Sequence, residues 1–229
     1  MPHNCKFPDY VIERILAKRG KLEVFDHFDP TKTALVIIDM QNFFVEEVET
    51  AISICPNINK LSDVVRERGG VVAWVQLTVA EDKNGPSLWP IYHDYFFTEA
   101  KMQAHKEGLT LGSDGHAIFQ DLNVKNEDII SLKSRFSSFI QGSSDLHEKL
   151  QDRGIENLLF AGTATNFCCE TSARDAMMIG YRVVMVSDAN AARYDEDHLA
   201  GLTTIWQSFG DVRDVEECVE VLLAPRAGQ

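Results

Sequence analysis

Positive charge is scarce in this sequence. Its 229 residues carry 22 lysines and arginines against 35 aspartates and glutamates, a formal net charge of −13. A chain this acidic is repelled by nucleic acid and by anionic lipid, so we expect neither as a partner. No apolar run approaches the ~20 residues of a membrane span, and the first residues, MPHNCKFPDYVIER, lack the apolar stretch of a signal peptide. These absences favour a cytoplasmic protein that has no contact with a membrane.

Cysteine patterns that form disulfides or bind metals are also missing. The five cysteines, Cys5, Cys55, Cys168, Cys169 and Cys218, are odd in number and scattered, which does not resemble a disulfide framework. Such usage is typical of a reducing compartment. No CxxC, CxxxC or HExxH occurs, so the sequence indicates no cysteine-rich or zincin-type metal site. We expect no metal and no cofactor.

The sequence has no linker rich in proline, glycine or serine. With 45% hydrophobic residues it can build a full core, so we expect one domain at 31–224. An N-terminal arm at 1–30 precedes it, and its apolar residues predict an amphipathic helix that packs on a neighbouring subunit or on the domain edge. A loop excursion at 80–127 contains the aromatic segment SLWPIYHDYFF (87–97). That segment would shape a pocket or a subunit interface, or form an ordered surface loop.

What is present is a regular alternation of strand-like and helix-like segments. We expect strands at 33–39, 71–79, 128–133, 157–162, 181–187 and 211–213, and helices at 56–68, 143–153, 168–179, 196–208 and 214–223. Ser143 or Ser144 would cap the second of these helices. The strands are continuous apolar runs, which is typical of strands buried on both faces. The pattern predicts an α/β protein with a parallel sheet between two layers of helices.

Chemically active side chains occur where three of these strands end. Asp39 follows ALVII, Lys133 ends IISLK, and a polar turn at 162–168 follows the strand at 157–162. Ligands of parallel sheets bind beyond the carboxyl ends of the strands. A carboxylate that ends a buried strand is costly unless it is paired or functional, although Asp39 would also suit an N-cap or a structural ion pair. The alternative for Lys133 is a non-functional lysine at the point where a strand leaves the core and enters solvent.

Cys168 lies at the end of that polar turn. Ala173, Ala176 and Met177 recur at helical spacing after it, so the cysteine is expected to open a helix. A thiol at a helix N-terminus has a lowered pKa, and the turn's backbone N–H groups can hold an oxyanion. Cys169 is adjacent, so the two side chains diverge and only one can face a given pocket. The alternative for either is inert packing.

Three segments in this order resemble the motifs of the isochorismatase-like cysteine hydrolase superfamily. They are ALVIIDMQNFF (34–44), SLKSRFSSF (131–139) and GTATNFCCETSARDAMMIGYRVVMVSDANAA (162–192), and with the order of strands and helices the likeness covers most of residues 31–222. The resemblance implies a three-layer α-β-α, Rossmann-like fold. Its six-stranded, mostly parallel sheet is expected to have the order 3-2-1-4-5-6, with helices on both faces.

The same resemblance implies a catalytic triad of Cys168, Asp39 and Lys133. It assigns the nucleophile to Cys168, because Cys169 stands where the family usually has valine. It also implies a cis peptide bond between Thr163 and Ala164. An oxyanion hole would then be made by the backbone N–H groups of Ala164 and Cys168.

Departures from the family narrow the expected chemistry. Nicotinamidases of the superfamily carry a D-x-H…H metal cluster, whereas VEEVETAISICPNIN (45–59) contains no histidine. True isochorismatases lack the nucleophilic cysteine, so Cys168 favours C–N cleavage over vinyl-ether hydrolysis. The usual Pro/Gly-rich loop of that region is missing, so part of the pocket wall must come from 80–115 or from the arm. We expect a metal-independent amidohydrolase that cleaves a small linear ureido or amide substrate through a thioester, similar to ureidoacrylate, biuret or N-carbamoyl amidohydrolases.

Several side chains near the motifs are candidates for binding substrate. The set consists of Gln41, Asn42, Phe44, Trp74, Arg135, Phe136, Asn166 and Gln207. Amide side chains would bond a carboxamide, Arg135 would pair with a substrate carboxylate, and Trp74 and Phe136 would line the pocket. For each of these side chains the alternative is a purely structural role, as a helix cap, a solvated surface residue or part of the core. The acidic segment ARYDEDH (192–198) is interpreted only as a loop that leads into a helix.

Two other functions remain open from the sequence. The chain would also suit a maleamate- or nicotinamide-type amidase of the same superfamily. Alternatively, it is a catalytically idle interaction or redox-sensing protein that uses the Cys168–Cys169 pair. The expected partner is a small-molecule substrate. A homo-oligomer, a dimer or a tetramer, is expected from the resemblance, with apolar residues of 1–30 and 87–97 at the interfaces.

Overall fold

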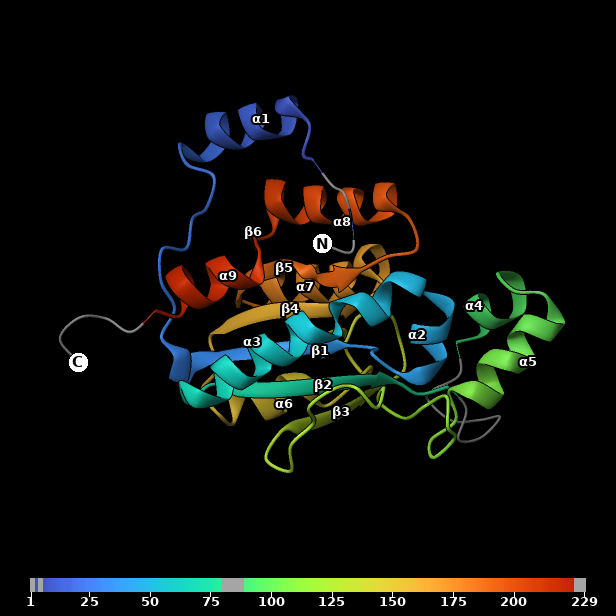
Figure 1. The fold of residues 1–229 in the computed structure, drawn as a ribbon. Coiled ribbons are helices and arrows are strands. Elements are labelled where there is room, and N and C mark those ends of the chain that lie inside the picture. The colour runs from blue at the N-terminus through green and yellow to red at the C-terminus, as the bar shows by residue number, and fades with distance from the viewer. Residues whose placement is uncertain (1–2, 4–5, 80–88, 225–229) are drawn as a thin grey trace.

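The computed structural model describes residues 3, 6–79 and 89–224, and its centre is a six-stranded sheet. The strands are β1 (Thr33–Ile38), β2 (Val71–Leu77), β3 (Ile129–Lys133), β4 (Asn157–Thr163), β5 (Arg182–Ala191) and β6 (Asp211–Arg213). Their order is β3-β2-β1-β4-β5-β6, and every neighbouring pair is parallel. The expected α/β fold and strand order are confirmed (Figure 1).

Both faces of the sheet are covered along β1, β2 and β4, which explains their continuous apolar runs, whereas edge strand β3 buries only alternate residues and leaves Ile130 and Leu132 exposed. In β1, Ala34, Val36 and Ile38 belong to a core shared with helices α6, α7 and α8, whereas Leu35 and Ile37 point into a second core shared with α3 and α9. The helices are α3 (Cys55–Glu67), α6 (Leu146–Gln151), α7 (Glu170–Met178), α8 (Asp195–Ser208) and α9 (Val215–Glu217). Alternate side chains thus enter opposite layers, as successive residues of a strand must. In Figure 1, α3 and α9 lie in front of the sheet and α6 and α7 behind it.

Two helix boundaries differ from those expected. Helix α6 begins at Leu146, with Asp145 rather than a serine at its N-cap. The Asp145 side chain makes no capping hydrogen bond, and Ser144 Oγ instead accepts from the Leu146 backbone N–H at 3.2 Å, so the expected capping by Ser144 is met from one residue further out. Ser143 Oγ and Ser144 Oγ also donate to the carbonyl oxygens of Ser137 and Ser138 in the preceding loop. The helix expected to open at Cys168 is preceded by a π-helical turn at Thr165–Cys169, and a second such turn, Cys218–Leu222, follows α9.

The N-terminal arm packs on its own domain. Helix α1 (Asp9–Arg19) lies over α8, with Val11 and Ile15 fully buried in the core (Figure 1). Lys18 Nζ donates a hydrogen bond to the Gln207 carbonyl oxygen of α8 at 3.0 Å. Of the two expected places for the arm, the structure therefore shows the edge of the domain.

The excursion contains two helices where only a loop was expected. Helices α4 (Pro90–Tyr95) and α5 (Glu99–Gly108) stand beyond the carboxyl ends of β1 and β2, beside α2 (Asn42–Glu47) (Figure 1). Thr98 caps α5 by accepting a hydrogen bond from the Lys101 backbone. Residues 80–88 of this excursion lie outside the described residues. Short 3-10 turns occupy Pro30–Lys32 and Glu49–Ile54. Within the described ranges, no helix has the length and apolarity to cross a membrane.

Candidate active site

Asp39 leaves β1 in an unusual backbone conformation. Its φ is +51°, in the left-handed region that residues other than glycine rarely adopt, with asparagine and aspartate the commonest exceptions. Its backbone N–H still donates to the Val75 carbonyl oxygen of β2 at 2.9 Å. The side chain is 1% exposed. A strained backbone that buries a carboxylate is the kind of feature found at functional sites.

The Asp39 carboxylate is paired with Lys133. Lys133 ends β3, which lies on the far side of β2, and its Nζ is 2.6 Å from Asp39 Oδ2. Nζ also donates a hydrogen bond to the Phe136 carbonyl oxygen at 3.0 Å. Both side chains are shielded from solvent. The strand ends of the sheet therefore bring the acid and the amine together, as their positions in the sequence suggested.

Burial and mutual attraction set the charges of this pair. Burial raises the pKa of Asp39 above its usual value, although Lys133 and a hydrogen bond from Cys168 oppose the rise. Burial by itself lowers the pKa of Lys133, but the Asp39 carboxylate and the Cys168 side chain outweigh it, so the pKa of Lys133 is raised. Lys133 is consequently held as an ammonium ion, and Asp39 is a stronger base than an exposed aspartate.

The Cys168 thiol completes this cluster from the π-helical turn. It lines the same cavity as Asp39, and the charges of Asp39 and Lys133 both act on its pKa. The expectation that its pKa falls is wrong. Burial and the Asp39 carboxylate raise the pKa of the thiol, and these two effects outweigh the attraction of Lys133. The resting cysteine is therefore protonated and needs a base, which Asp39 is placed to provide.

Cys169 points away from this cluster. It is fully buried, and its Sγ donates a weak hydrogen bond to the Ala161 carbonyl oxygen of β4 at 4.0 Å. Cys168 instead lines a cavity together with Asp39. The expected divergence of the two adjacent cysteines is confirmed.

The turn between β4 and α7 carries the expected cis peptide bond, which joins Thr163 to Ala164. Both residues line the same cavity as Cys168. The assignment of the Ala164 and Cys168 backbone N–H groups to an oxyanion hole stays a prediction.

The cavity in front of Cys168 has a volume of about 430 Å³ and a largely aromatic wall. Seven aromatic side chains line it: Phe44, Tyr92, Phe96, Phe97, Phe136, Phe167 and Tyr194. They come from α2, from the α4–α5 excursion, from the loop after β3, from the π-helical turn and from the start of α8. The excursion therefore supplies part of the wall within the same chain, and no described residue of the N-terminal arm lines it.

Three of the eight candidate substrate-binding residues line this cavity, namely Phe44, Phe136 and Asn166. The amide of Gln41 is instead used by the protein: Nε2 donates to the Leu77 and His116 carbonyl oxygens, and Oε1 accepts from Leu77 N–H. Asn42 Nδ2 donates to the Asp114 carbonyl oxygen. The side chains of Gln41 and Asn42 thus tie loops together and do not line the cavity.

Trp74 and Gln207 also lie elsewhere. Trp74 is buried in the core beneath α3, where its indole N–H donates to Asp128 Oδ2 at 2.7 Å. Gln207 lies on α8, where its carbonyl oxygen accepts from Lys18 of α1. Neither lines the cavity at Cys168.

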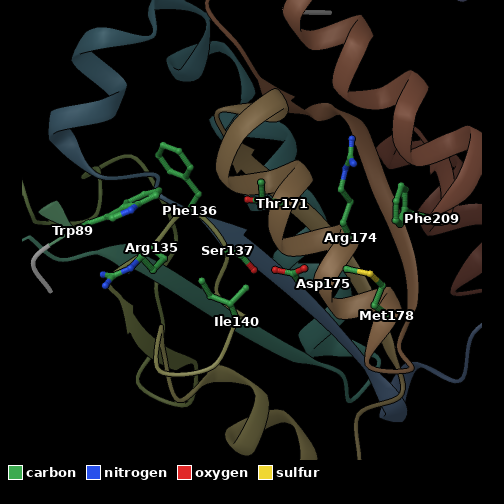
Figure 2. A pocket seen from close by; sticks show the side chains of 10 residues that line it. All are labelled: Trp89, Arg135, Phe136, Ser137, Ile140, Thr171, Arg174, Asp175, Met178 and Phe209. Atoms are coloured by element: carbon green, nitrogen blue, oxygen red, sulfur yellow. The ribbon is translucent and has the colours of Figure 1, made fainter. Parts of the chain in front are cut away.

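Arg135 belongs to a second cavity, of about 520 Å³, which Figure 2 shows from close by. Its guanidinium lies 5.6 Å from the ring centre of Trp89, and Arg174 and Asp175 of α7 line the same cavity. Phe136 lines both cavities and so separates them. Because Asp39 and Cys168 line the other cavity, Arg135 is not placed to hold a substrate carboxylate at the thiol.

Sequence reasoning missed several lining residues. Arg193, Tyr194 and Asp197 belong to the segment interpreted only as a loop leading into a helix, yet all three line the cavity. His105 and Lys101 come from α5, which was expected to be a loop. The aromatic run at 87–97 was the one signal that pointed to this wall, and Tyr92, Phe96 and Phe97 confirm the expectation that it shapes a pocket.

Comparisons with known proteins identify the family of this chain. The family model of the isochorismatase domain matches residues 33–217. An uncharacterised isochorismatase family protein of Bacillus subtilis (strain 168) is 30% identical over 194 residues, which are 85% of this chain and 96% of that protein. A probable inactive nicotinamidase of Arabidopsis thaliana is 33% identical over 178 residues, 74% of this chain and 86% of that protein.

Among solved structures, a cysteine hydrolase from Pseudomonas syringae pv. phaseolicola 1448A is similar to this chain. The two share 26% of their residues and superpose with a TM-score of 0.75, over 87% of this chain and 97% of the other.

Proposed function

The chain belongs to the isochorismatase family, and from that premise we propose that it is a cysteine amidohydrolase in which Asp39, Lys133 and Cys168 are the catalytic residues. The observation that carries the proposal is the buried ion pair between Lys133 Nζ and Asp39 Oδ2, at 2.6 Å, beside a thiol that opens onto a cavity. A buried ion pair alone is weak evidence of function. The Cys168 thiol, which shares a cavity with Asp39, adds a nucleophile to the base and the fixed positive charge of this pair.

In the first half of the proposed reaction, Asp39 accepts the proton of the Cys168 thiol. The thiolate attacks the carbonyl carbon of an amide or ureido group, and the backbone N–H groups of Ala164 and Cys168 hold the oxyanion. Asp39 then returns the proton to the departing nitrogen as the C–N bond breaks. Ammonia or an amine leaves, and the acyl group remains on sulfur as a thioester.

In the second half, water takes the place of the leaving amine. Asp39, ionised again, accepts a proton from the water as its oxygen attacks the thioester carbonyl. The C–S bond breaks, the thiol is regenerated with that proton, and a carboxylic acid leaves. Lys133 stays charged throughout and keeps the Asp39 carboxylate oriented toward the sulfur.

The proposed substrates are linear amides and ureido compounds, linear meaning that the scissile C–N bond lies outside a ring. Asn166 lines the cavity two residues before the nucleophile. Its side-chain amide is placed to bond a carboxamide or ureido group, because it offers both a donor and an acceptor.

Ammonia release from a panel of ureidoacrylate, biuret, N-carbamoyl amino acids, maleamate and nicotinamide tests the proposal. We expect release by the wild-type protein, unchanged by a chelator, and its loss by at least ~10³-fold in Cys168→Ser. Cys169→Ser is the matched control, because that thiol is one residue away and points into the core. Turnover retained in Cys168→Ser would overturn the mechanism, and a Cys168 that is labelled by thiol reagents but turns over no amide would favour a redox role.

A further inference from the structure

His3 of the N-terminal arm is buried against the connection between β5 and α8. Its side chain is 2% exposed. Its Nδ1 lies 2.7 Å from Asp195 Oδ1, and its Nε2 accepts a hydrogen bond from the Ala192 backbone N–H at 3.1 Å. Because Nε2 accepts, the ring hydrogen belongs on Nδ1, which donates it to Asp195. One imidazole therefore ties down the residues on either side of Arg193 and Tyr194.

The Ala192 end of this connection is buried. Strand β5 ends at Ala191, so Ala192 is the first residue beyond the sheet, and it is fully buried. A buried backbone N–H that loses its acceptor costs free energy comparable to a lost hydrogen bond. The Ala192 carbonyl oxygen accepts from Thr50 Oγ1 at 2.7 Å. His3 is thus one of two side chains that fix the backbone where it leaves the sheet.

The connection that His3 ties down supplies part of the active cavity. Arg193 and Tyr194 line the cavity in front of Cys168, whereas His3 does not. Both side chains are exposed, so packing constrains them little and their direction follows the backbone that carries them. Arg193 Nη2 also donates to the Glu47 carbonyl oxygen at 3.1 Å. Any effect of His3 on a substrate must therefore act through the position of these neighbours.

His3 also reaches the segment that carries the nucleophile. Its ring is stacked on that of His198, with 4.1 Å between ring centres and 17° between ring planes. His198 Nδ1 lies 2.7 Å from Thr165 Oγ1, and Thr165 begins the π-helical turn that contains Cys168. The same imidazole therefore connects two segments of the cavity wall, one directly and the other through His198.

We propose that His3 is a positioning residue for substrate binding, which holds the backbone of 192–195 so that Arg193 and Tyr194 face the substrate. The inference rests on the proposed amidohydrolase function and gives the N-terminal arm a role in it. A protein in which this connection is released must return it to place before substrate binds well, so the apparent affinity falls by the fraction that is in place. The hydrogen bonds of His3 involve none of the three proposed catalytic residues, so the chemical step should be unaffected.

Two substitutions separate the hydrogen bonds of His3 from its ring. His3→Phe keeps a ring that can stack on His198 but has neither a donor nor an acceptor. His3→Gln has no ring, but its amide offers one donor and one acceptor. For the panel substrate that the wild type turns over, we expect KM to rise about tenfold in His3→Phe with kcat unchanged within about twofold. His3→Gln should recover most of the wild-type KM.

Ile15→Ala is the control for a general loss of stability. Ile15 belongs to α1 of the same arm and is buried in the core, and it does not line the active cavity. A variant that is merely less stable contains less active protein, which lowers the measured kcat and leaves KM unchanged. We therefore expect the wild-type KM in Ile15→Ala. An unchanged KM in His3→Phe, or an equal rise in Ile15→Ala, would overturn the inference.

Hydrogen–deuterium exchange tests the position of the connection without turnover. The Ala192 amide should exchange at least about tenfold faster in His3→Phe than in the wild type, because a local opening is enough to expose it. The Val36 amide of the central strand β1 should be accelerated less, since its exchange requires the sheet to open. His3→Gln should resemble the wild type at both amides. Equal acceleration at Ala192 and Val36 in His3→Phe would show a general loss of stability and contradict the positioning role.

Together the two measurements distinguish failure of this inference from failure of the function on which it rests. Ammonia release that is lost in Cys168→Ser, with an unchanged KM in His3→Phe, would confirm the amidohydrolase function and contradict the inference. No ammonia release from any panel substrate would contradict the function. Fast exchange confined to Ala192 in His3→Phe would then still support the positioning of the cavity wall by His3.

Discussion

Gly162 and Ile38 are register partners on β4 and β1, and a Cβ atom at Gly162 would stand 2.1 Å from the Ile38 carbonyl oxygen. Gly162 also has a φ of +115°, which L side chains rarely adopt. Asp39 follows Ile38 directly, and the turn that ends in Cys168 follows Gly162. The close contact of these two residues therefore sets how near the proposed base lies to the proposed nucleophile.

Gly162→Ala should consequently lower both stability and activity. The added methyl group meets backbone that cannot rotate away, so we expect a loss on the order of 3 kcal/mol in the free energy of unfolding and a large fall in kcat. Gly154→Ala is the control, because Gly154 also has a positive φ but an added Cβ atom there would meet nothing within 4 Å. Gly154→Ala should lower the free energy of unfolding by about 1 kcal/mol. Equal losses in the two variants, measured by urea unfolding, would show that the contact with Ile38 does not matter.

Removing the Lys133 amine alone should lower the free energy of unfolding more than removing both charges of the buried pair. Lys133→Met leaves the Asp39 carboxylate buried and uncompensated, which typically costs about 3–5 kcal/mol. Asp39→Asn/Lys133→Met removes the uncompensated charge, so its free energy of unfolding should exceed that of the single variant, although neither protein should turn over substrate. Urea unfolding of the wild type and of the three variants, including Asp39→Asn, gives the coupling energy. A double variant less stable than Lys133→Met would contradict the electrostatic account.

Asp39→Asn should make Cys168 more reactive while abolishing catalysis. Burial raises the pKa of the Cys168 thiol most, the Asp39 carboxylate raises it further, and Lys133 lowers it. Removing the negative charge of Asp39 therefore leaves Lys133 to stabilise the thiolate. We expect iodoacetamide to alkylate Cys168 at least about tenfold faster at pH 7 in the variant, read by mass spectrometry. Cys55 serves as an internal control, since burial raises its pKa to about 11 and it should stay unlabelled in both proteins. Slower labelling in Asp39→Asn would mean that the carboxylate promotes ionisation of the thiol at rest.

Acid should destabilise the protein partly through His198. Burial lowers the pKa of His198 to about 3, whereas an unfolded histidine titrates near 6.5. The unfolded chain therefore binds the extra proton first, so stability is full above about pH 6.5 and is lost as the pH falls toward 3. From pH 7 to pH 5 this one group should account for about 2 kcal/mol of the free energy of unfolding.

His198→Gln isolates that contribution, because glutamine can still bond Thr165 but does not titrate. Urea unfolding at pH 7 and pH 5 should show a loss smaller by about 2 kcal/mol in the variant than in the wild type. Identical pH dependence of the two proteins would place the acid sensitivity in other groups.

The sequence by itself determined the sheet and the three proposed catalytic positions. Apolar runs buried on both faces predicted parallel strands, and parallel strands end at one edge, so Asp39, Lys133 and Cys168 had to lie near each other. The motifs around them assigned the nucleophile to Cys168 rather than Cys169. The parallel strands followed from the local pattern of apolar residues, which reflects burial directly, whereas the strand order and the choice of nucleophile followed from the resemblance of the motifs to a known superfamily.

Only the tertiary structure decided the pKa of Cys168 and the nature of the cavity wall. The sequence showed a thiol at a helix end, which lowers a pKa, but burial and the neighbouring Asp39 carboxylate raise it, and both act through space. Likewise, His105 and Arg193 reach the cavity because α5 and the start of α8 fold over the strand ends. Desolvation and long-range packing depend on segments that are distant in the chain, so no local pattern of residues contains them.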